Sequence, residues 1–465
     1  MAFENIPAAN ANNESESNPG AWYRGLTRYH WFVFVVASLG WLFDTMDQQL
    51  FNLARNSAIT ELLGRSANAD AIARQGGYAT SIFMIGWAIG GLFFGVLGDR
   101  IGRAKTMLLT ILVYSGFTGL SAISVGVWDF ACYRFLTGLG VGGEFAVGVA
   151  LVAEVMPDRS RPFALGMLQA LSAIGNITAG FVSIAIGLAG QSKIVDPTRS
   201  WRLMFLIGII PAILAIPIFR KLKEPERWKK AATIEGKDPV KYKLGSLAEF
   251  FGDLRWRSNA IVGMTLAFAG VVGLWGIGFF SPELIDSVFK REFAKQGLSV
   301  SEISAKLTIW KGITFIIQNT GAFFGVYAFS HLSHRFGRRP AFAIAFILAM
   351  ASTAFTFQFF NRFSDIFWMI PIMGFCQLSI FGGYAIYFPE LFPTRLRSTG
   401  TSFCYNVGRL VAAVGPTVFG LLTGYVFAGY AQPIRPAGVA MCGVFLIGLL
   451  ILPFAPETKG KPLPE

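Results

Sequence analysis

The stretch "GDRIGRAK" (98–105) decides the fold, because it returns as "SHRFGRRP" at 333–340. A second stretch, "EVMPDRSR" (154–161), returns as "ELFPTRLR" (390–397), and "EPE" (224–226) returns as "APE" (455–457). The pairs occur in the same order, at separations of 235, 236 and 231 residues. Such agreement predicts two halves of similar architecture, arranged as a parallel repeat and joined by the basic loop 220–257.

The composition places both halves in a membrane. Hydrophobic residues make up 53% of the 465-residue chain and charged residues 14%, whereas soluble domains carry roughly 25% charged residues. Each apolar run of about 18 or more residues predicts one transmembrane helix. The runs are 30–54, 78–98, 107–127, 129–153, 163–187, 201–219, 258–286, 307–330, 341–360, 365–388, 399–427 and 434–455. We therefore expect an all-α membrane protein with twelve transmembrane helices in two six-helix bundles, related by a pseudo-twofold axis.

This arrangement divides the chain into five segments. They are a disordered cytoplasmic tail (1–28), a first bundle (29–219), a cytoplasmic linker (220–257), a second bundle (258–455) and a cytoplasmic C-terminal tail (456–465). With both termini in the cytoplasm, most Lys and Arg residues lie on the cytoplasmic side, as the positive-inside rule requires. The net charge of +13 therefore reflects topology and predicts no nucleic-acid partner. We expect a multi-pass protein of the plasma membrane, the inner membrane in a bacterium.

Four ionisable residues interrupt the expected helices 1 and 4, namely Asp44, Asp47, Arg134 and Glu144. A rise of about 1.5 Å per residue places both aspartates and Arg134 at one level, roughly 21–25 Å from the cytoplasmic side. A buried charge is costly, so we expect an ion pair there. Two carboxylates beside one guanidinium can also take up and release a proton, as a proton symporter requires. The alternative is a static salt bridge between the two helices. Glu144 is either a second proton site or a partner of the cytoplasmic arginines.

Arg409 lies alone in expected helix 11, about 16 Å from its start. A guanidinium cannot lose its charge, so it needs an anionic partner, and an anionic substrate is the simplest candidate. Alternatively, backbone carbonyls or Asn406 hold Arg409 in place. Further candidates for substrate contact are Asn406, Gln318, Gln377 and Trp275, although each of these residue types also serves packing between helices.

Charged residues also gather at the cytoplasmic helix ends, in the repeated stretches. Opposite charges there can pair across the loops and close the cytoplasmic side whenever the two halves meet. Alternatively, these residues only satisfy topology, because single surface ion pairs contribute little. The candidate gating residues are Asp99, Arg100, Arg103, Glu154, Arg161, Arg335, Arg338, Glu390 and Arg397.

These motifs resemble those of the major facilitator superfamily over nearly the whole chain. The matching residues are Gly95, Asp99, Arg100, Gly102 and Arg103 after helix 2, Arg134, Gly138, Gly140 and Gly142 in helix 4, and the sugar-porter-like "EPERW" and "PETKG". One departure is His334, which stands where the second loop copy should carry an acid.

The resemblance implies an alternating-access transporter, and organic acid and sugar symporters are the nearest branches. In the family pattern a helix 1 aspartate lies near the helix 4 arginine, and Asp44 and Arg134 match those positions best. Carboxylate transporters are similar in having an arginine on helix 11. We therefore expect proton-coupled symport of a small organic anion, with a sugar or polyol symporter as the first alternative and a non-transporting membrane sensor as a distant one.

Other function classes fit the sequence poorly. The chain shows no nucleophile–base set or metal-ligand spacing, so we expect neither an enzyme nor a cofactor or metal site. The expected partners are a small-molecule substrate, protons and the lipid bilayer, and the expected state is a monomer.

Overall fold

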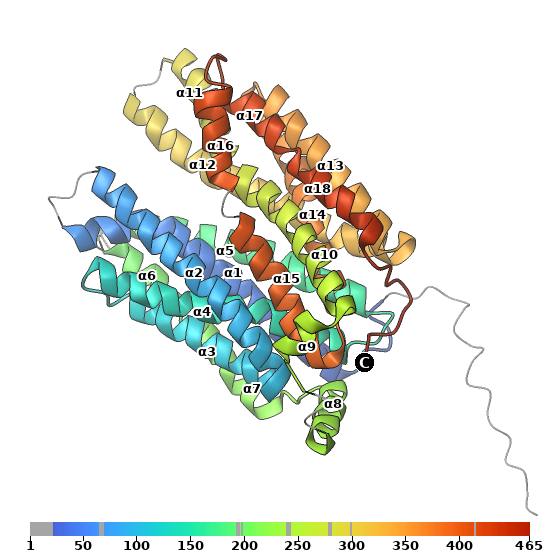
Figure 1. Ribbon diagram of the computed structural model, residues 1–465. Coiled ribbons are helices and arrows are strands. Elements are labelled where there is room, and N and C mark those ends of the chain that lie inside the picture. The colour runs from blue at the N-terminus through green and yellow to red at the C-terminus, as the bar shows by residue number, and fades with distance from the viewer. Residues whose placement is uncertain are drawn as a thin grey trace, which may run out of the picture.

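The computed structural model describes residues 22–64, 69–191, 196, 199–238, 243–277, 281–297, 300–412 and 415–465. Within these residues every regular element is a helix (Figure 1), which confirms the expected all-α fold class. Most of the expected tail 1–28 lies outside the described residues.

The first half contains helices α1 to α7 and the second half α10 to α18, with α8 and α9 between them. The first-half helices are α1 (Arg28–Leu63), α2 (Ala69–Ile101), α3 (Arg103–Ser121), α4 (Val127–Val155), α5 (Arg161–Gln191), α6 (Ser200–Ile207) and α7 (Ala215–Lys221). The linker helices are α8 (Glu226–Lys237) and α9 (Leu247–Gly252). The second-half helices are α10 (Leu254–Val271), α11 (Ser281–Lys295), α12 (Val300–Phe336), α13 (Arg338–Phe359), α14 (Met369–Glu390), α15 (Arg397–Ala412), α16 (Gly415–Leu421), α17 (Ile434–Met441) and α18 (Val444–Ile451).

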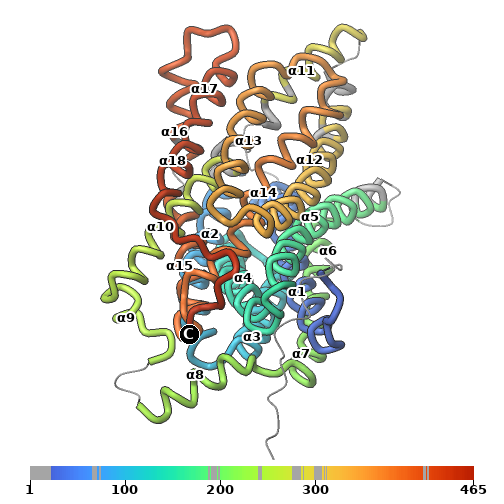
Figure 2. The backbone as a smooth tube through the Cα atoms, turned by 90° about the vertical axis from the view of Figure 1, so that its right-hand side faces the viewer, coloured from blue at the N-terminus to red at the C-terminus, as the bar shows by residue number. Residues whose placement is uncertain are grey.

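Nine helical stretches within the described residues are long and apolar enough to cross a membrane. The remaining three of the twelve expected spans correspond to α1, to α3 and to α15 with α16. They are helical too, but their sequences carry polar side chains along their length. The two halves meet where α2 lies beside α15 and α5 beside α12 (Figure 2).

The two halves share one helix-crossing geometry. A Cβ atom added at Gly86 of α2 would lie 2.2 Å from the carbonyl oxygen of Phe135 on α4. In the second half, a Cβ atom at Gly321 of α12 would lie 2.0 Å from the carbonyl oxygen of Pro371 on α14. Gly321 follows Gly86 by 235 residues, which is the separation of the loop motifs. Close backbone approach at small residues is typical of helix packing in lipid, and here it repeats with the sequence.

Both copies of the loop motif turn at a glycine, Gly102 with φ +110° and Gly337 with φ +100°. Residues with side chains rarely adopt this conformation. Beside each turn a carboxylate accepts hydrogen bonds from the first amides of the next helix: Glu224 from α3 and Glu457 from α13. The counterpart of Glu457 is therefore Glu224, whereas the alignment of "EPE" with "APE" pairs it with Glu226.

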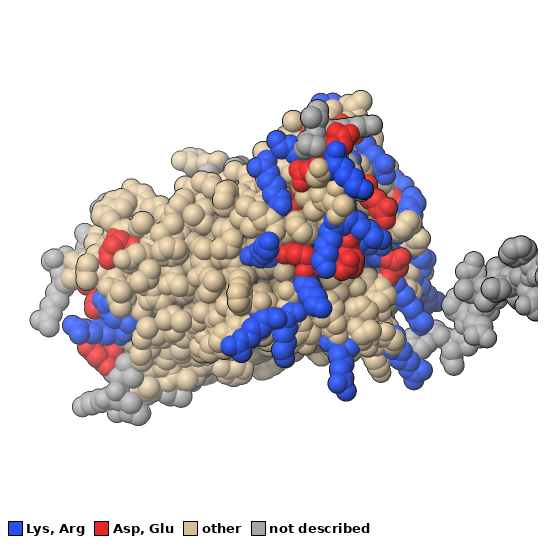
Figure 3. All heavy atoms as spheres, turned by 90° about the horizontal axis from the view of Figure 1, so that it is seen from below, with Lys and Arg blue, Asp and Glu red and all other residues tan. Residues whose placement is uncertain are grey.

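Lys and Arg side chains gather at one end of the molecule, while the broad middle of the same face is almost free of charge (Figure 3). We call this end the basic end and define it by residues 99–105, 154–161, 334–340 and 390–397. It holds both copies of the loop motif.

Candidate functional site

Asp47 and Arg134 form a buried ion pair between α1 and α4. Nη1 of Arg134 lies 3.7 Å from Oδ2 of Asp47, and neither side chain is exposed. Thr118 of α3 donates a hydrogen bond of 2.8 Å to Oδ1 of Asp47, and Nε of Arg134 donates one of 3.0 Å to the hydroxyl of Ser121. The Phe205 ring of α6 lies 4.7 Å from Cζ of Arg134. The pair is therefore enclosed by side chains of the first half.

Asp44 lies on α1 three residues before Asp47 but has different neighbours. Its Oδ2 accepts a hydrogen bond of 3.3 Å from Gln48, and its buried Oδ1 has no hydrogen-bond partner among the described residues. The charged groups that act on Asp44 are Glu144, Asp47 and Arg409. Its one cationic neighbour among them thus comes from the second half of the molecule.

Our expectation that Asp44 pairs with Arg134 is therefore wrong, and Asp47 takes that place. Residues three apart on a helix point about 60° away from each other, at roughly 100° per residue. The two aspartates consequently face different partners, although they lie at similar depth.

Glu144 of α4 packs against α1 and α3. Thr110 donates a hydrogen bond of 2.5 Å to its Oε2. Its Oε1 lies so close to α1 that a Cβ atom at Gly40 would be 2.3 Å away, and this oxygen has no hydrogen-bond partner among the described residues. Pairing of Glu144 with the arginines of the basic end was one of our two alternatives, and these contacts contradict it.

Arg409 of α15 lies between two aromatic rings. Its Cζ is 3.9 Å from the ring centroid of Trp87 on α2 and 4.2 Å from that of Tyr405, one turn earlier on α15. Its Nε and Nη1 atoms are buried without hydrogen-bond partners among the described residues. Asn406 does not hold Arg409, because its amide bonds Ser402 of its own helix. Tyr405 and Arg409 are four residues apart and therefore lie on one face of α15. This spacing could have predicted the contact between the ring and the guanidinium, but it was missed.

Two contacts made by asparagine side chains connect the halves. Nδ2 of Asn406 reaches the carbonyl oxygen of Gly142 on α4 at 3.5 Å, and a Cβ atom at Gly91 of α2 would collide with the Asn406 amide. Asn176 of α5 donates a hydrogen bond of 2.9 Å to Oδ1 of Asn319 on α12. Both contacts must change if the halves rock against each other.

The other substrate-contact candidates lie elsewhere. Gln377 is buried in α14 and donates a hydrogen bond of 2.8 Å to Thr353 of α13. The opposite side of α13 is exposed, so α13 lies at the outside of the second half. This contact therefore favours a packing role for Gln377. Gln318 of α12 is partly buried beside Gly374 of α14. The side chain of Trp275 lies outside the described residues.

At the basic end, Glu154 binds two arginines that belong to different halves. Its Oε1 accepts hydrogen bonds of 2.8 Å from Nη2 of Arg103 and of 2.8 Å from Nη1 of Arg397. Asp99 accepts bonds of 3.1 Å and 2.8 Å from the backbone amides of Ser398 and Thr399, which begin α15. Carboxylates are favourable at helix N-termini, so Asp99 caps α15 across the boundary between the halves.

We call these side chains of Asp99, Arg103, Glu154 and Arg397, with the amides of 398 and 399, the first-half clasp. Its charged side chains are buried. Burial lowers the pKa of Arg397 to about 10, while Glu154 acts in the opposite direction. Arg397 therefore stays charged at neutral pH, and the clasp holds the two halves together at the basic end.

The second copy of the motif lacks this link between the halves. Nη2 of Arg338 lies 2.6 Å from Oε1 of Glu390, and both belong to the second half. Arg161, the counterpart of Arg397, pairs with Asp158 and donates a hydrogen bond of 2.9 Å to the carbonyl oxygen of Ala153 in its own half. The two remaining gating candidates, Arg100 and Arg335, are exposed at the ends of α2 and α12.

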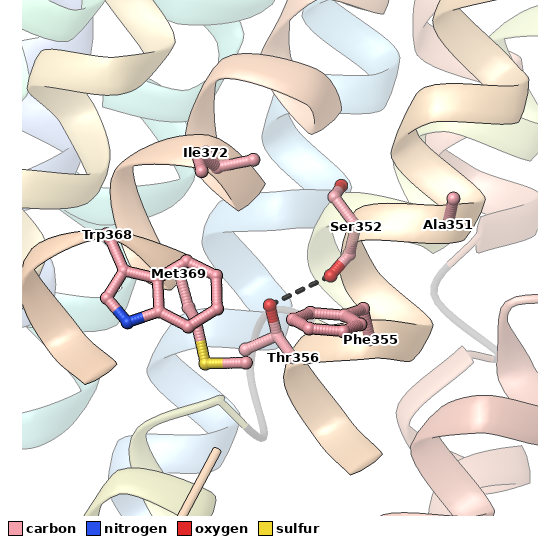
Figure 4. A pocket seen from close by; sticks show the side chains of 7 residues that line it. All are labelled: Ala351, Ser352, Phe355, Thr356, Trp368, Met369 and Ile372. Carbon is pink, nitrogen blue, oxygen red and sulfur yellow. Dashed lines mark hydrogen bonds between the residues drawn. The ribbon is translucent and has the colours of Figure 1, made fainter. Parts of the chain in front are cut away.

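An apolar hollow lies on the outer surface of the second half, between α13 and α14 (Figure 4). Phe355, Trp368 and Ile372 line it and are all exposed. The hollow holds no charged side chain and does not include Arg409 or the buried aspartates, so it is no candidate for an ionic substrate.

Comparisons with known proteins identify the fold and the family. A cis,cis-muconate transport protein of Acinetobacter baylyi is 28% identical over 413 residues, covering 88% of this chain and 92% of that protein. A benzoate transport protein of the same organism is 24% identical over 463 residues, covering 91% and 90%. The solved structure of the proton:xylose symporter XylE bound to 6-bromo-6-deoxy-D-glucose has a TM-score of 0.72 at 20% identity, covering 94% of this chain and 98% of that one.

Residues 37–292, more than half of the chain, match the family described as Major Facilitator Superfamily. The family consists of membrane transporters, and the matched relatives are transporters rather than enzymes. The chain therefore belongs to the Major Facilitator Superfamily.

Proposed function

We propose that this transporter is a symporter that moves a small organic anion together with protons by alternating access. The observation that carries the proposal is the position of Arg409. Its guanidinium lies between aromatic rings of both halves, retains unbonded N–H groups, and is attracted electrostatically by Asp44, which lies beyond ion-pair distance. Such a group can bind a carboxylate through two N–H donors while the rings bind the apolar part of the same molecule.

In this proposal Asp44 carries the proton. Ionised Asp44 balances the charge of Arg409 when no substrate is bound. A substrate carboxylate beside Arg409 takes over that balance, so Asp44 becomes the less favoured anion and is protonated. The loaded site is then electrically balanced, and the halves can change the side on which they open. Asp47 suits this task less, because Arg134 and Thr118 already bind its carboxylate.

We further propose that the basic end is cytoplasmic, which agrees with the positive-inside rule. The cytoplasm then holds both termini and the linker 220–257. The linker joins bundle 29–219 to bundle 258–455, and the tail 456–465 follows the second bundle. The first-half clasp closes this side, so the described state is closed toward the cytoplasm. The protein then acts as a monomer in the plasma membrane, with Glu144 as a second proton site beside Thr110.

The names of the relatives support an organic acid as the substrate class, because muconate and benzoate are carboxylates that combine an anion with an apolar body. A sugar or polyol symporter is the second candidate, favoured by the likeness to the xylose symporter. At 20% identity that likeness extends to the fold alone. A neutral sugar would also leave Arg409 without an anionic ligand.

The test is uptake into proteoliposomes under an imposed pH gradient, after a thermal-shift screen of carboxylates, sugars and amines has found a stabilising ligand. We expect Asp44→Asn to abolish gradient-driven accumulation but to retain exchange of labelled substrate, because exchange needs no net proton movement. Glu226→Gln, which changes an exposed carboxylate of the linker, is the matched control. Unchanged accumulation in Asp44→Asn would remove Asp44 from coupling.

The substrate class has its own test. Arg409→Ala should eliminate the stabilisation that a carboxylate ligand gives, whereas Arg362→Ala, which removes an exposed arginine at the opposite end from the clasp, should retain it. If stabilisation by sugars were found instead and persisted in Arg409→Ala, the sugar proposal would replace the organic-acid proposal.

A further inference from the structure

A cavity occupies the place where pseudo-symmetry would put a second clasp. Its volume is about 780 Å³, and it lies at the basic end between the start of α5 and the end of α12, with residues 458–461 along one side. Both halves of the molecule contribute to its wall. It is separate from Arg409 and the buried aspartates, so what it binds does not depend on the identity of the substrate.

Three residue differences within the repeat remove the counterpart of the Asp99 cap. His334 stands at the position of Asp99, so the capping carboxylate is missing. Pro162 stands at the position of Ser398 and has no backbone N–H to donate. Phe163 stands at the position of Thr399, and its ring lies 5.0 Å from that of His334. The acid and one of its amide donors are thus both absent, so the bonds that Asp99 accepts from Ser398 and Thr399 have no counterpart here, although α5 and α12 still touch through Phe163.

The wall of this cavity is strongly cationic. Six Lys or Arg side chains line it against two carboxylates. Both carboxylates are already engaged, since Asp158 and Glu390 each pair with an arginine of their own half. Among the described residues, no carboxylate forms an ion pair with Arg335, Lys459 or Lys461. The cavity therefore has room and positive charge for an added anion.

We propose that the cavity binds a phosphate group, carried by a soluble anion or by a lipid headgroup. A phosphate offers several acceptor oxygens on one centre, which suits a wall that holds both guanidinium and ammonium donors. Arg161 of the first half and Arg335 of the second half both face the cavity. A bound phosphate would connect the halves as Asp99 does in the first-half clasp, and it would favour the state that is closed at the basic end.

Thermal unfolding of the full-length protein tests the proposal in two arms. The first adds sodium phosphate to protein in detergent, against sodium chloride at matched ionic strength. The second compares nanodiscs of phosphatidylcholine with nanodiscs that also contain phosphatidic acid. We expect a rise in Tm of about 2–4 °C in at least one arm. A response to free phosphate identifies a soluble anion, and a response to phosphatidic acid alone identifies the headgroup.

The variants decide whether the response comes from this cavity. His334→Asp restores the acid of the motif and places a carboxylate among the cations, so it should abolish the rise in Tm. The double variant Arg335→Gln/Lys461→Gln removes only exposed cations and should at least halve the rise. Arg362→Gln, at the opposite end, should respond like the wild type. An equal rise in all these proteins, or no rise for the wild type in either arm, overturns the proposal.

Discussion

The two halves repeat one helical scaffold but differ in what they bury at mid-depth. The first half encloses Asp44, Asp47, Arg134 and Glu144, all of them buried. Among the described residues, the second half buries amides and hydroxyls at this depth, such as Gln377, and its one buried carboxylate lies at the basic end. The two halves therefore share their helix packing. The buried mid-depth carboxylates, however, occur only in the first half among the described residues.

This difference suggests a division of labour. A charge in the middle of a membrane costs at least about 2.5–3.5 kcal/mol on the insertion scale, so several in one bundle indicate a function rather than a packing accident. In our proposal the first half carries the proton on Asp44, and the second half contributes Arg409 and Tyr405 to the substrate site. Arg409 is the exception in the second half, and its guanidinium lies against Trp87 of the first half.

The largest effect that tests this comparison should come from the two aspartates of α1. Asp47→Ala leaves Arg134 buried without its carboxylate, which should lower the free energy of unfolding by about 3–5 kcal/mol. Asp44→Ala removes one hydrogen bond to Gln48 and the charge that balances Arg409, but Asp44 lies beyond ion-pair distance of Arg409, which is only partly buried, so the cost should be about 1–2 kcal/mol. Unfolding titrations of both purified variants measure the difference.

The opposite ranking would break the comparison. If Asp44→Ala were the more destabilised variant, the charge balance between Asp44 and Arg409 would stabilise the fold more than the ion pair of Asp47 with Arg134. Asp47→Asn separates lost charge from lost volume, because the amide keeps an oxygen that can accept the hydrogen bond of Thr118.

The buried ionisable residues could be predicted from the sequence, but their pairing could not. The repeat, the helical class and the buried position of Asp44, Asp47 and Arg134 follow from spacing and from the cost of charge in lipid. Asp44 and Asp47 differ in direction by only about 60° around α1. Residue spacing alone cannot tell which of them faces Arg134.

The partner hydroxyls were missed for a related reason. Thr118 and Ser121 of α3 bind Asp47 and Arg134, yet in sequence they look like ordinary small residues of a membrane helix. Conversely, the sequence already shows that the two loop copies differ, because His334 stands where the first copy has Asp99. Only the structure shows that Pro162 and Phe163 lie beside His334.

An intermediate effect should distinguish the two motif copies at the basic end. Glu154→Gln weakens bonds to arginines of both halves, whereas Glu390→Gln weakens a pair within one half. Hydrogen bonds to charged groups contribute about 1.5–3 kcal/mol, so Glu154→Gln should shift the protein toward opening at this end. Spin labels at the exposed positions Arg100 and Arg335 report the distance between the halves. We expect a longer-distance population in Glu154→Gln and little change in Glu390→Gln.

Equal behaviour of these two variants would mean that the clasp does not control opening. Lys105→Gln, which removes an exposed cation beside the clasp, is the control for a general effect of charge.

The smallest effect concerns the carboxylates that cap α3 and α13. Burial opposes ionisation of Glu457, but backbone amides of Arg338, Arg339, Thr458 and Lys459 donate to it and hold its pKa below its ordinary value of 4.5. A carboxylate with a lowered pKa stabilises the fold above that ordinary value, and the stabilisation is lost as pH falls through the lowered pKa.

Glu457→Gln should therefore lower stability by about 0.5–1 kcal/mol at pH 7, because Glu457 is partly exposed and solvent weakens its bonds. The difference from the wild type should shrink once the pH drops below 4.5.

Glu224→Gln is the matched variant of the first half, where the carboxylate accepts bonds from two amides at 3.2 and 3.1 Å. It should cost less than Glu457→Gln at pH 7. Thermal unfolding of the three proteins between pH 4 and 7 measures both differences, and a larger cost for Glu224→Gln would show that the number of amide donors does not set the strength of these caps.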